Sequence, residues 1–200
     1  MRYSLSTHTD GSYLPLDINT STLVHREDAN TGTRYIRVIG FNRGKRARNI
    51  SFSFNDVEAL YATVQPTGNS QILLPDIPIY NNGTGIDIYA SLRQSALAWT
   101  LPQNIENTIV LDNNGEVVGI DLSNFAADAS AQPLLVHVTD SRRSNTDVDP
   151  SKGSDAIIEI YQTNGSIGVE IIESGYKFES GSLRVSLKSA VYIYGDTFLD

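Results

Sequence analysis

The sequence contains no cysteine, one tryptophan and one methionine among 200 residues. A chain without cysteine forms no disulfide, zinc–thiolate site, iron–sulfur cluster or thiol nucleophile. No run of 18 apolar residues is present, and the first residues lack the apolar region of a secretory signal. We therefore expect no membrane partner and, unless the protein belongs to a virion, a cytoplasmic location.

The charge is unevenly distributed along a chain whose formal net charge is −8. Residues 1–50 hold eight basic and four acidic side chains, so their balance is 8 − 4 = +4. The other 150 residues hold seven basic and 19 acidic side chains, a balance of −12. The overall acidity disfavours general nucleic-acid binding, and the asymmetry points to a charge-guided partner.

Short strands are the main secondary-structure signal. Residues 34–41 and 50–54 alternate apolar and polar side chains and are rich in β-branched and aromatic types, which is typical of strands. Asn–Gly pairs at 114–115 and 164–165 are strong hairpin signals. Similar segments add up to about ten to twelve short strands. We predict an all-β fold, a β-sandwich or a jelly-roll-like arrangement.

The domain prediction follows from a change in composition and hydrophobic pattern near residue 34. Residues 1–33 are rich in serine and threonine and have no hydrophobic period, so they are expected to form an extended N-terminal arm or irregular lead-in. Residues 34–200 are expected to form a single β domain. The polar stretch 141–155 is interpreted as an exposed loop within it.

Three segments have a less regular pattern. Residues 71–80 contain Pro75 and Pro78, which predicts an edge strand or an extended crossing because proline donates no ladder hydrogen bond. Residues 55–64 fit a short helix capped by Asn55 or a strand. Residues 91–99 have helical spacing but also fit a strand.

The basic segment GFNRGKRAR at 40–48 is expected to be a hairpin turn with Gly44 at positive φ. It fails the phosphate-loop pattern, because Gly40 and Gly44 are one residue too close and Arg46 stands where Ser or Thr is required. It also lacks the interleaved aromatic residues of a single-strand nucleic-acid groove. A solvated turn is one interpretation. We slightly favour a basic surface that docks on the acidic surface of a neighbouring subunit, through Arg43, Lys45, Arg46 and Arg48.

Residues 147–155 suggest a weak calcium site, because Asp147, Asp149 and Ser151 are at alternate positions. The loop lacks the glycine and glutamate of an EF-hand, where Lys152 and Ile158 stand. A solvated acidic turn is the favoured interpretation, so no cofactor or metal is expected.

The sequence offers little support for catalysis. The three histidines are far apart, and neither a G-x-S-x-G nor an H-E-x-x-H motif is present. We expect no enzymatic activity, although a glycoside hydrolase remains open because a carboxylate pair forms only in the fold. The candidates on late strands are Glu159, Glu170 and Glu173.

Tyrosines suggest a second kind of site, a sugar-binding platform on a β-sandwich. Tyr192 and Tyr194 share one strand face by period two. Ordinary packing at the rim of a sheet is the favoured interpretation. The candidates on late strands are Tyr161, Tyr176, Tyr192 and Tyr194.

Two functions from different classes follow. The cysteine-free, Ser/Thr/Asn-rich chain is similar in texture to small capsid-decoration, tail or baseplate proteins of bacteriophages, a resemblance of composition without a shared motif. It implies a non-enzymatic structural protein of the virion, oligomeric in its assembly, that docks on protein subunits through its arm and basic turn. The alternative is a carbohydrate-binding β-sandwich module, assisted by calcium.

Overall fold

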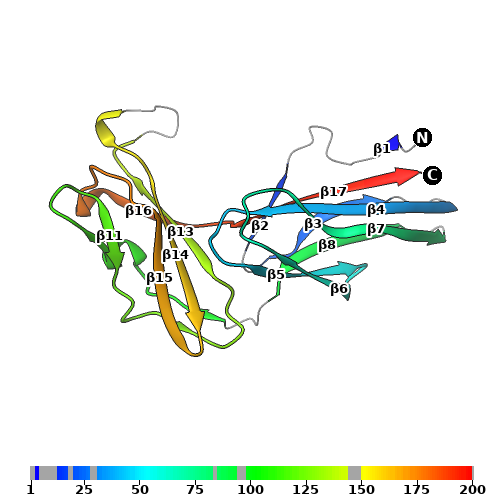
Figure 1. Cartoon of the computed structure of the whole chain (residues 1–200), viewed down its shortest axis with the longest axis horizontal. Coiled ribbons are helices and arrows are strands. Elements are labelled where there is room, and N and C mark those ends of the chain that lie inside the picture. The colour runs from blue at the N-terminus through cyan, green and yellow to red at the C-terminus, as the bar shows by residue number, and fades with distance from the viewer. Residues whose placement is uncertain are drawn as a thin grey trace. The chain divides into compact units, whose positions relative to one another are not determined.

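The computed structural model describes residues 3–4, 13–17, 20–27, 31–82, 85–93, 98–143 and 150–199. Strands β1–β17 and three short 3-10 helices make up the regular structure of these residues (Figure 1). Eleven of the described strands, β3 to β8 and β13 to β17, hold six residues or more. The predicted all-β, sandwich-like fold is confirmed. No helix in the described ranges is long and apolar enough to cross a membrane.

The contacts of the chain divide it into two compact units, where the sequence indicated one domain over 34–200. Unit 1 comprises Met1–Arg93 and Ser189–Asp200, and unit 2 comprises Gln94–Lys188. Unit 2 is thus an insertion between β8 (Ile86–Leu92) and β17 (Val191–Leu199) of unit 1. The division carries no composition signal, because both units are built from strands with the same alternating pattern.

Unit 1 consists of two antiparallel sheets. Sheet A has the order β1-β17-β4-β7, with β2 also paired to β17, and sheet B has the order β3-β8-β5-β6. One buried cluster takes side chains from both sheets, such as Val38 and Ile193 from sheet A and Ile50 and Phe52 from sheet B. The remaining strands of the two sheets are β1 (Tyr3–Ser4), β2 (Leu14–Leu16), β3 (Thr22–Glu27), β4 (Thr31–Asn42), β5 (Arg48–Phe54), β6 (Val57–Val64) and β7 (Gln71–Asn82).

The described parts of residues 1–33 lie within this sandwich instead of forming a separate arm. Strand β2 pairs with β17, strand β3 pairs with β8, and Leu16 and Val24 are fully buried. The pairing of β3 shifts register between Leu23 and His25, where a bulge leaves Val24 and His25 both buried. Such a bulge breaks the period of two, which explains why the sequence pattern did not predict a strand here.

The basic segment is not a hairpin turn, contrary to the prediction. Strand β4 pairs with β17 and β7, whereas β5 pairs with β6 and β8, so residues 43–47 connect the two sheets. Gly44 does not have a positive φ. Strand alternation alone cannot separate the two geometries, because it has the same period whether consecutive strands pair or lie in facing sheets.

The ambiguous segments of unit 1 are strands where they are described. Asn55 and Asp56 have φ values of 48° and 65° and form the two-residue turn between β5 and β6, so Asn55 caps no helix. Strand β8 ends at Leu92 and β9 begins at Trp99, while residues 94–97 lie outside the described residues. Strand β7 pairs only with β4 among the described strands, which confirms the predicted edge strand.

Unit 2 contains a four-stranded antiparallel sheet of order β15-β14-β13-β16. The predicted hairpin at Asn164–Gly165 joins β14 and β15, with φ values of 50° and 82° that suit an Asn–Gly turn. The predicted hairpin at 114–115 joins β10 and β11. The strands of unit 2 are β9 (Trp99–Thr100), β10 (Ile109–Leu111), β11 (Val117–Ile120), β12 (Ala126–Ala127), β13 (Leu134–Asp140), β14 (Ala156–Thr163), β15 (Ser166–Glu173) and β16 (Leu183–Lys188).

Candidate interaction surface

The buried side chain of Asn42 holds the basic connection in place at the end of β4. Its Nδ2 donates to the carbonyl oxygens of Arg46 at 2.8 Å and Val64 at 3.1 Å, and its Oδ1 accepts from Gly44 N at 2.9 Å. Arg43 N donates to Ala190 O at 2.8 Å. These bonds join the connection to β6 and to the start of β17. The backbone of residues 43–46 is therefore held by hydrogen bonds within unit 1.

The four predicted partner-binding bases have different environments. Arg43 and Lys45 are exposed, Arg46 is half-buried, and Arg48 is fully buried. Arg48 begins β5 on the same side as Ile50 and Phe52, so the strand period directs its side chain inward. Its Nη1 donates to Arg46 O. Arg48 is therefore a structural residue, and of the four bases only Arg43 and Lys45 are exposed, with Arg46 half-buried next to Lys45 in the chain.

The guanidinium of Arg43 lies over two aromatic rings. Its Cζ is 4.6 Å from the ring centroid of Tyr192 and 5.6 Å from that of Phe41. Phe41 and Tyr192 face each other in register across β4 and β17, and their rings stack with centroids 5.2 Å apart and planes 6° apart. Cation–π attraction of this kind restricts the guanidinium while leaving its N–H groups able to donate.

Tyr13 extends the aromatic contacts beside this pair. Its ring meets Phe41 edge-on at a centroid distance of 4.9 Å and lies 6.0 Å from Tyr194. Its hydroxyl is hydrogen-bonded to the Ser70 hydroxyl at 2.9 Å. Four aromatic rings from three segments of the sequence therefore form a continuous chain of contacts on one side of sheet A, in the order Tyr194, Tyr13, Phe41 and Tyr192.

We call this side the outer face of sheet A, defined by Tyr13, Ile39, Phe41, Ile72, Tyr192 and Tyr194. Val191 and Ile193 of β17 are fully buried, so the alternate residues Tyr192 and Tyr194 point away from the core. Ile39 is the register partner of both Tyr194 and Ile72, and Ile72 is 63% exposed. The aromatic cluster thus continues into an apolar row that reaches the edge strand β7.

An ion pair borders the outer face further along β4 and β7. Arg37 Nε donates to Asp76 Oδ1 at 2.8 Å, and Arg37 Nη2 donates to Asp76 Oδ2 at 3.1 Å. The outer face therefore has an apolar and aromatic centre, with a paired arginine on one side and Arg43 on the other. An apolar centre with a polar rim is the usual composition of a protein interface.

The four tyrosines named as a sugar platform divide between the units. Tyr192 and Tyr194 lie in unit 1, on the outer face of sheet A. Tyr161 lies in unit 2 on β14, and its ring covers Gly168, whose added Cβ would be 2.5 Å from the Tyr161 Cζ. Tyr176 is 42% exposed, with the Lys177 ammonium 5.6 Å from its ring centroid. The four tyrosines thus belong to two separate units.

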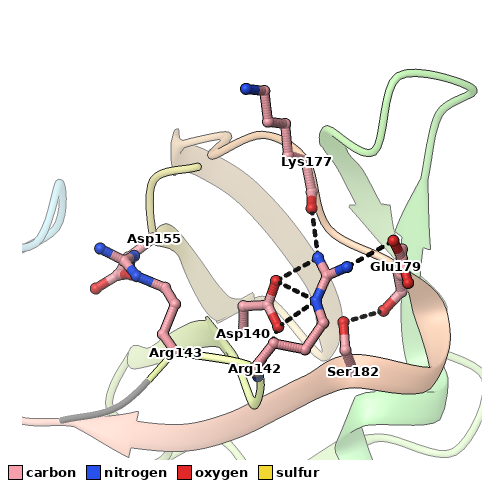
Figure 2. A network of polar contacts seen from close by, with 7 residues as sticks. All are labelled: Asp140, Arg142, Arg143, Asp155, Lys177, Glu179 and Ser182. Atoms are coloured by element: carbon pink, nitrogen blue, oxygen red, sulfur yellow. Dashed lines mark hydrogen bonds and ion pairs between the residues drawn. The ribbon is translucent and has the colours of Figure 1, made fainter. Parts of the chain in front are cut away.

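A polar network in unit 2 joins the end of β13 to the segment 177–182 (Figure 2). The side chain of Asp140 is completely buried and accepts hydrogen bonds from Arg142. Arg142 also donates to Glu179 Oε1 and to the Lys177 carbonyl oxygen. The hydrogen bonds from the Arg142 side chain hold the pKa of Asp140 below its usual range, against the opposing effect of burial. The same bonds raise the pKa of Arg142.

This network stabilises structure and offers little to a substrate. Arg142 Nε and Nη2 bond Asp140, Nη1 bonds Glu179, and Nη2 bonds a backbone carbonyl. Beside it, Asp155 accepts from Arg143 Nη1 at 2.6 Å and is hydrogen-bonded to His137 Nε2 at 3.0 Å. The sequence interpretation of 141–155 as one exposed loop missed these contacts, because the bonds to His137, Lys177 and Glu179 join the loop to residues outside it.

The calcium candidates are only partly described, whereas the three candidate glutamates are all described. Asp147 and Asp149 lie outside the described residues, and Ser151 is exposed on a short 3-10 helix. The described ranges contain no group of three or more metal-ligating side chains. Among the carboxylates, Glu159 is fully buried and is the register partner of Glu170, and Glu173 is opposite Ile157.

Comparison with known proteins places the chain in no family. No protein-family model matches the sequence, and no curated protein matches it either.

The basic residues are evident in the sequence, whereas the aromatic cluster beside them is not. Phe41 is the one aromatic residue in the basic segment, and Tyr13 lies in the segment interpreted as an arm. The sequence signal for this cluster was the spacing of two residues between Phe41 and Arg43 and between Tyr192 and Tyr194, which places each pair on one strand face. Only the pairing of β4 with β17 brings these two patterns together.

Proposed function

We propose that this chain is a non-enzymatic structural protein that assembles with other protein subunits, of the kind that form capsid decorations, tails or baseplates of bacteriophage virions. The observation that carries the proposal is the outer face of sheet A, with Arg43 beside it. Tyrosine, phenylalanine and arginine are the residue types enriched at protein interfaces. The virion location rests on the composition of the chain.

The docking surface in this proposal is the basic connection and the outer face, without an arm. Strands β2 and β3 pair with β17 and β8 inside unit 1, so these parts of residues 1–33 are not a detached arm that could add to a neighbour's sheet. Arg43 and Lys45 are exposed, and residues 51–200 have a balance of −12. Opposite charges of this kind guide association and fix its register.

The test is the mass of the purified chain by light scattering at low and high salt. A defined oligomer that dissociates at high salt supports the proposal, because exposed charges are screened by salt. The double variant Arg43→Glu and Lys45→Glu should lose the oligomer and keep its circular dichroism spectrum. The control double variant, Lys177→Glu and Arg184→Glu, makes the same change of net charge in unit 2. This control should keep the oligomer. A salt-independent monomer would count against the proposal.

The second candidate function is a carbohydrate-binding module. The observation that favours it is the contact of four aromatic rings on one sheet face, since aromatic side chains provide apolar area with polar edges. A glycan array with the monomeric chain tests it, with Tyr194→Ala as the variant. If calcium assists, millimolar Ca²⁺ should raise the melting temperature of the chain, and Asp147→Ala should remove the shift.

A further inference from the structure

We infer that Arg43 is the anchor of a self-association surface, in which the outer face of sheet A binds a second copy of this chain and the Arg43 guanidinium binds a carboxylate of that copy. The inference rests on the proposed assembly function and names the partner and the residue that recognises it. Three features carry it: the restricted guanidinium, the absence of a described carboxylate beside it, and the charge balance of the chain.

Arg43 differs from the paired arginines of the chain. Within the described residues, no carboxylate lies within ion-pair distance of Arg43, whose side-chain contacts are the rings of Phe41 and Tyr192. Elsewhere each arginine of a described ion pair has a carboxylate oxygen within 2.8 Å: Arg26, Arg37, Arg142 and Arg143. The planar donors of Arg43 are therefore available for bidentate binding of a carboxylate.

The Arg43 guanidinium is also restricted in conformation in the free chain. The two rings limit the side chain, and the bonds of Asn42 and Arg43 N limit the backbone. A group that is ordered in the free protein loses less conformational entropy on binding. Arginine set against aromatic residues is a frequent composition of interface hot spots.

The chain itself supplies a partner with the required charge. Residues 51–200 carry 19 acidic and seven basic side chains, against eight basic and four acidic in residues 1–50. A second copy therefore provides carboxylates for Arg43. The apolar row that ends at Ile72, 63% exposed, extends beyond the ring pair and suits the broader contact of a protein surface. Arg43 lies over the rings of Phe41 and Tyr192, where a sugar would stack, which disfavours a glycan there.

The experiment measures self-association of the full chain by sedimentation velocity over a concentration series. Arg43→Gln and, separately, Ile72→Glu should each raise the dissociation constant roughly tenfold or more, the size of effect of an interface hot spot. The matched control is Val118→Glu, because Val118 is 53% exposed on a strand of unit 2. The dissociation constant of the Val118→Glu variant should stay within about twofold of that of the unsubstituted chain, as expected of a peripheral position. Arg43→Lys keeps the charge and loses the planar donors. The dissociation constant of this variant should lie between those of the unsubstituted chain and Arg43→Gln.

A second measurement identifies the partner. Equal amounts of ¹⁴N- and ¹⁵N-labelled chain are mixed and treated with a carbodiimide, which joins lysines to carboxylates in direct contact. A cross-linked peptide that contains Lys45 from one label and an acidic residue from the other supports the inference. An oligomer that is unchanged by Arg43→Gln and Ile72→Glu, with no mixed-label link at Lys45, overturns the inference while the assembly function stands. A monomer at every concentration, or a monomer whose outer face binds an acidic glycan, overturns both.

Discussion

The buried carboxylate of Asp140 accepts four hydrogen bonds from Arg142, two residues further along the chain. Arg142 Nε donates to both oxygens at 2.9 and 3.0 Å, Nη2 donates to Oδ2 at 2.5 Å, and the backbone N donates to Oδ1 at 2.8 Å. The same guanidinium reaches Glu179 and the Lys177 carbonyl oxygen. One arginine thus joins the end of β13 to the segment that leads into β16.

Arg142→Ala should destabilise unit 2, because it leaves the buried Asp140 carboxylate without its charged donors. We expect a loss of about 2–3 kcal/mol in the free energy of unfolding, the scale of an incompletely bonded buried charge. The single tryptophan, Trp99, lies in unit 2, so its fluorescence during urea unfolding reports this change. Arg184→Ala is the control, since Arg184 is exposed on β16 and should change stability by less than about 0.5 kcal/mol. Equal effects of the two substitutions would contradict the structural role of Arg142.

Acid should remove the contribution of Asp140. Hydrogen bonds from Arg142 lower its pKa in the folded state, so its stabilising effect is complete above the pKa of the unfolded chain, about 3.9. The effect is lost as the pH falls through the lower, folded pKa. The difference in unfolding free energy between the original chain and Asp140→Asn should therefore be largest near neutral pH and shrink below about pH 4. Asp112 and Asp121, whose pKa values are also lowered, are present in both proteins and cancel in the difference. A difference that is constant from pH 7 to pH 2 would refute this assignment.

Gly115→Ala should destabilise unit 2 more than Gly165→Ala. Both glycines have positive φ, 77° and 82°, so both substitutions strain the backbone by about 1 kcal/mol. A Cβ on Gly115 would be 2.5 Å from the Phe178 carbonyl oxygen, whereas a Cβ on Gly165 has nothing within 4 Å. We expect Gly115→Ala to exceed its control by at least about 1 kcal/mol, the cost of local overpacking. Thermal unfolding followed by Trp99 fluorescence compares the two, and equal losses would show that the hairpin moves away from Phe178 without cost.

Asn42→Ala should loosen the basic connection and lower the stability of unit 1. It removes the donor to the Arg46 and Val64 carbonyl oxygens and the acceptor of Gly44 N. The expected loss is about 2 kcal/mol, because buried polar groups are left without partners. Hydrogen exchange should become faster at the Gly44 amide. Asn49→Ala is the matched control, since Asn49 is exposed on β5 and its side chain bonds the Thr63 hydroxyl. Unchanged exchange at Gly44 in the Asn42 variant would argue against this restraint.

Local patterns in the sequence identified most of the secondary structure. Alternating segments at 34–41 and 50–54 are strands, and the Asn–Gly pairs at 114–115 and 164–165 join hairpins. The two prolines of residues 71–80 correctly predicted an edge strand. These features depend on the conformation of a few consecutive residues, so they can be read from short stretches of the chain.

The bulge in β3 and the burial of Arg48 could not be predicted from such local patterns. At the bulge, two consecutive residues, Val24 and His25, are both buried, and no alternating pattern survives. Arg48 belongs to a run of basic residues that suggests an exposed turn, yet the start of β5 directs it inward. Charge patterns do not reveal which residue of a run begins a strand.

The sequence by itself determined most of the strands, the two Asn–Gly hairpin turns and the charge asymmetry of the chain. Only the tertiary structure decided that β4 and β5 lie in different sheets, that residues 94–188 form an inserted unit, and that Phe41 stacks on Tyr192 beneath Arg43. Strand conformation and tight turns follow from local backbone and side-chain preferences. Pairing between residues as distant as 41 and 192 depends instead on which sheet arrangement buries the apolar faces of the whole chain.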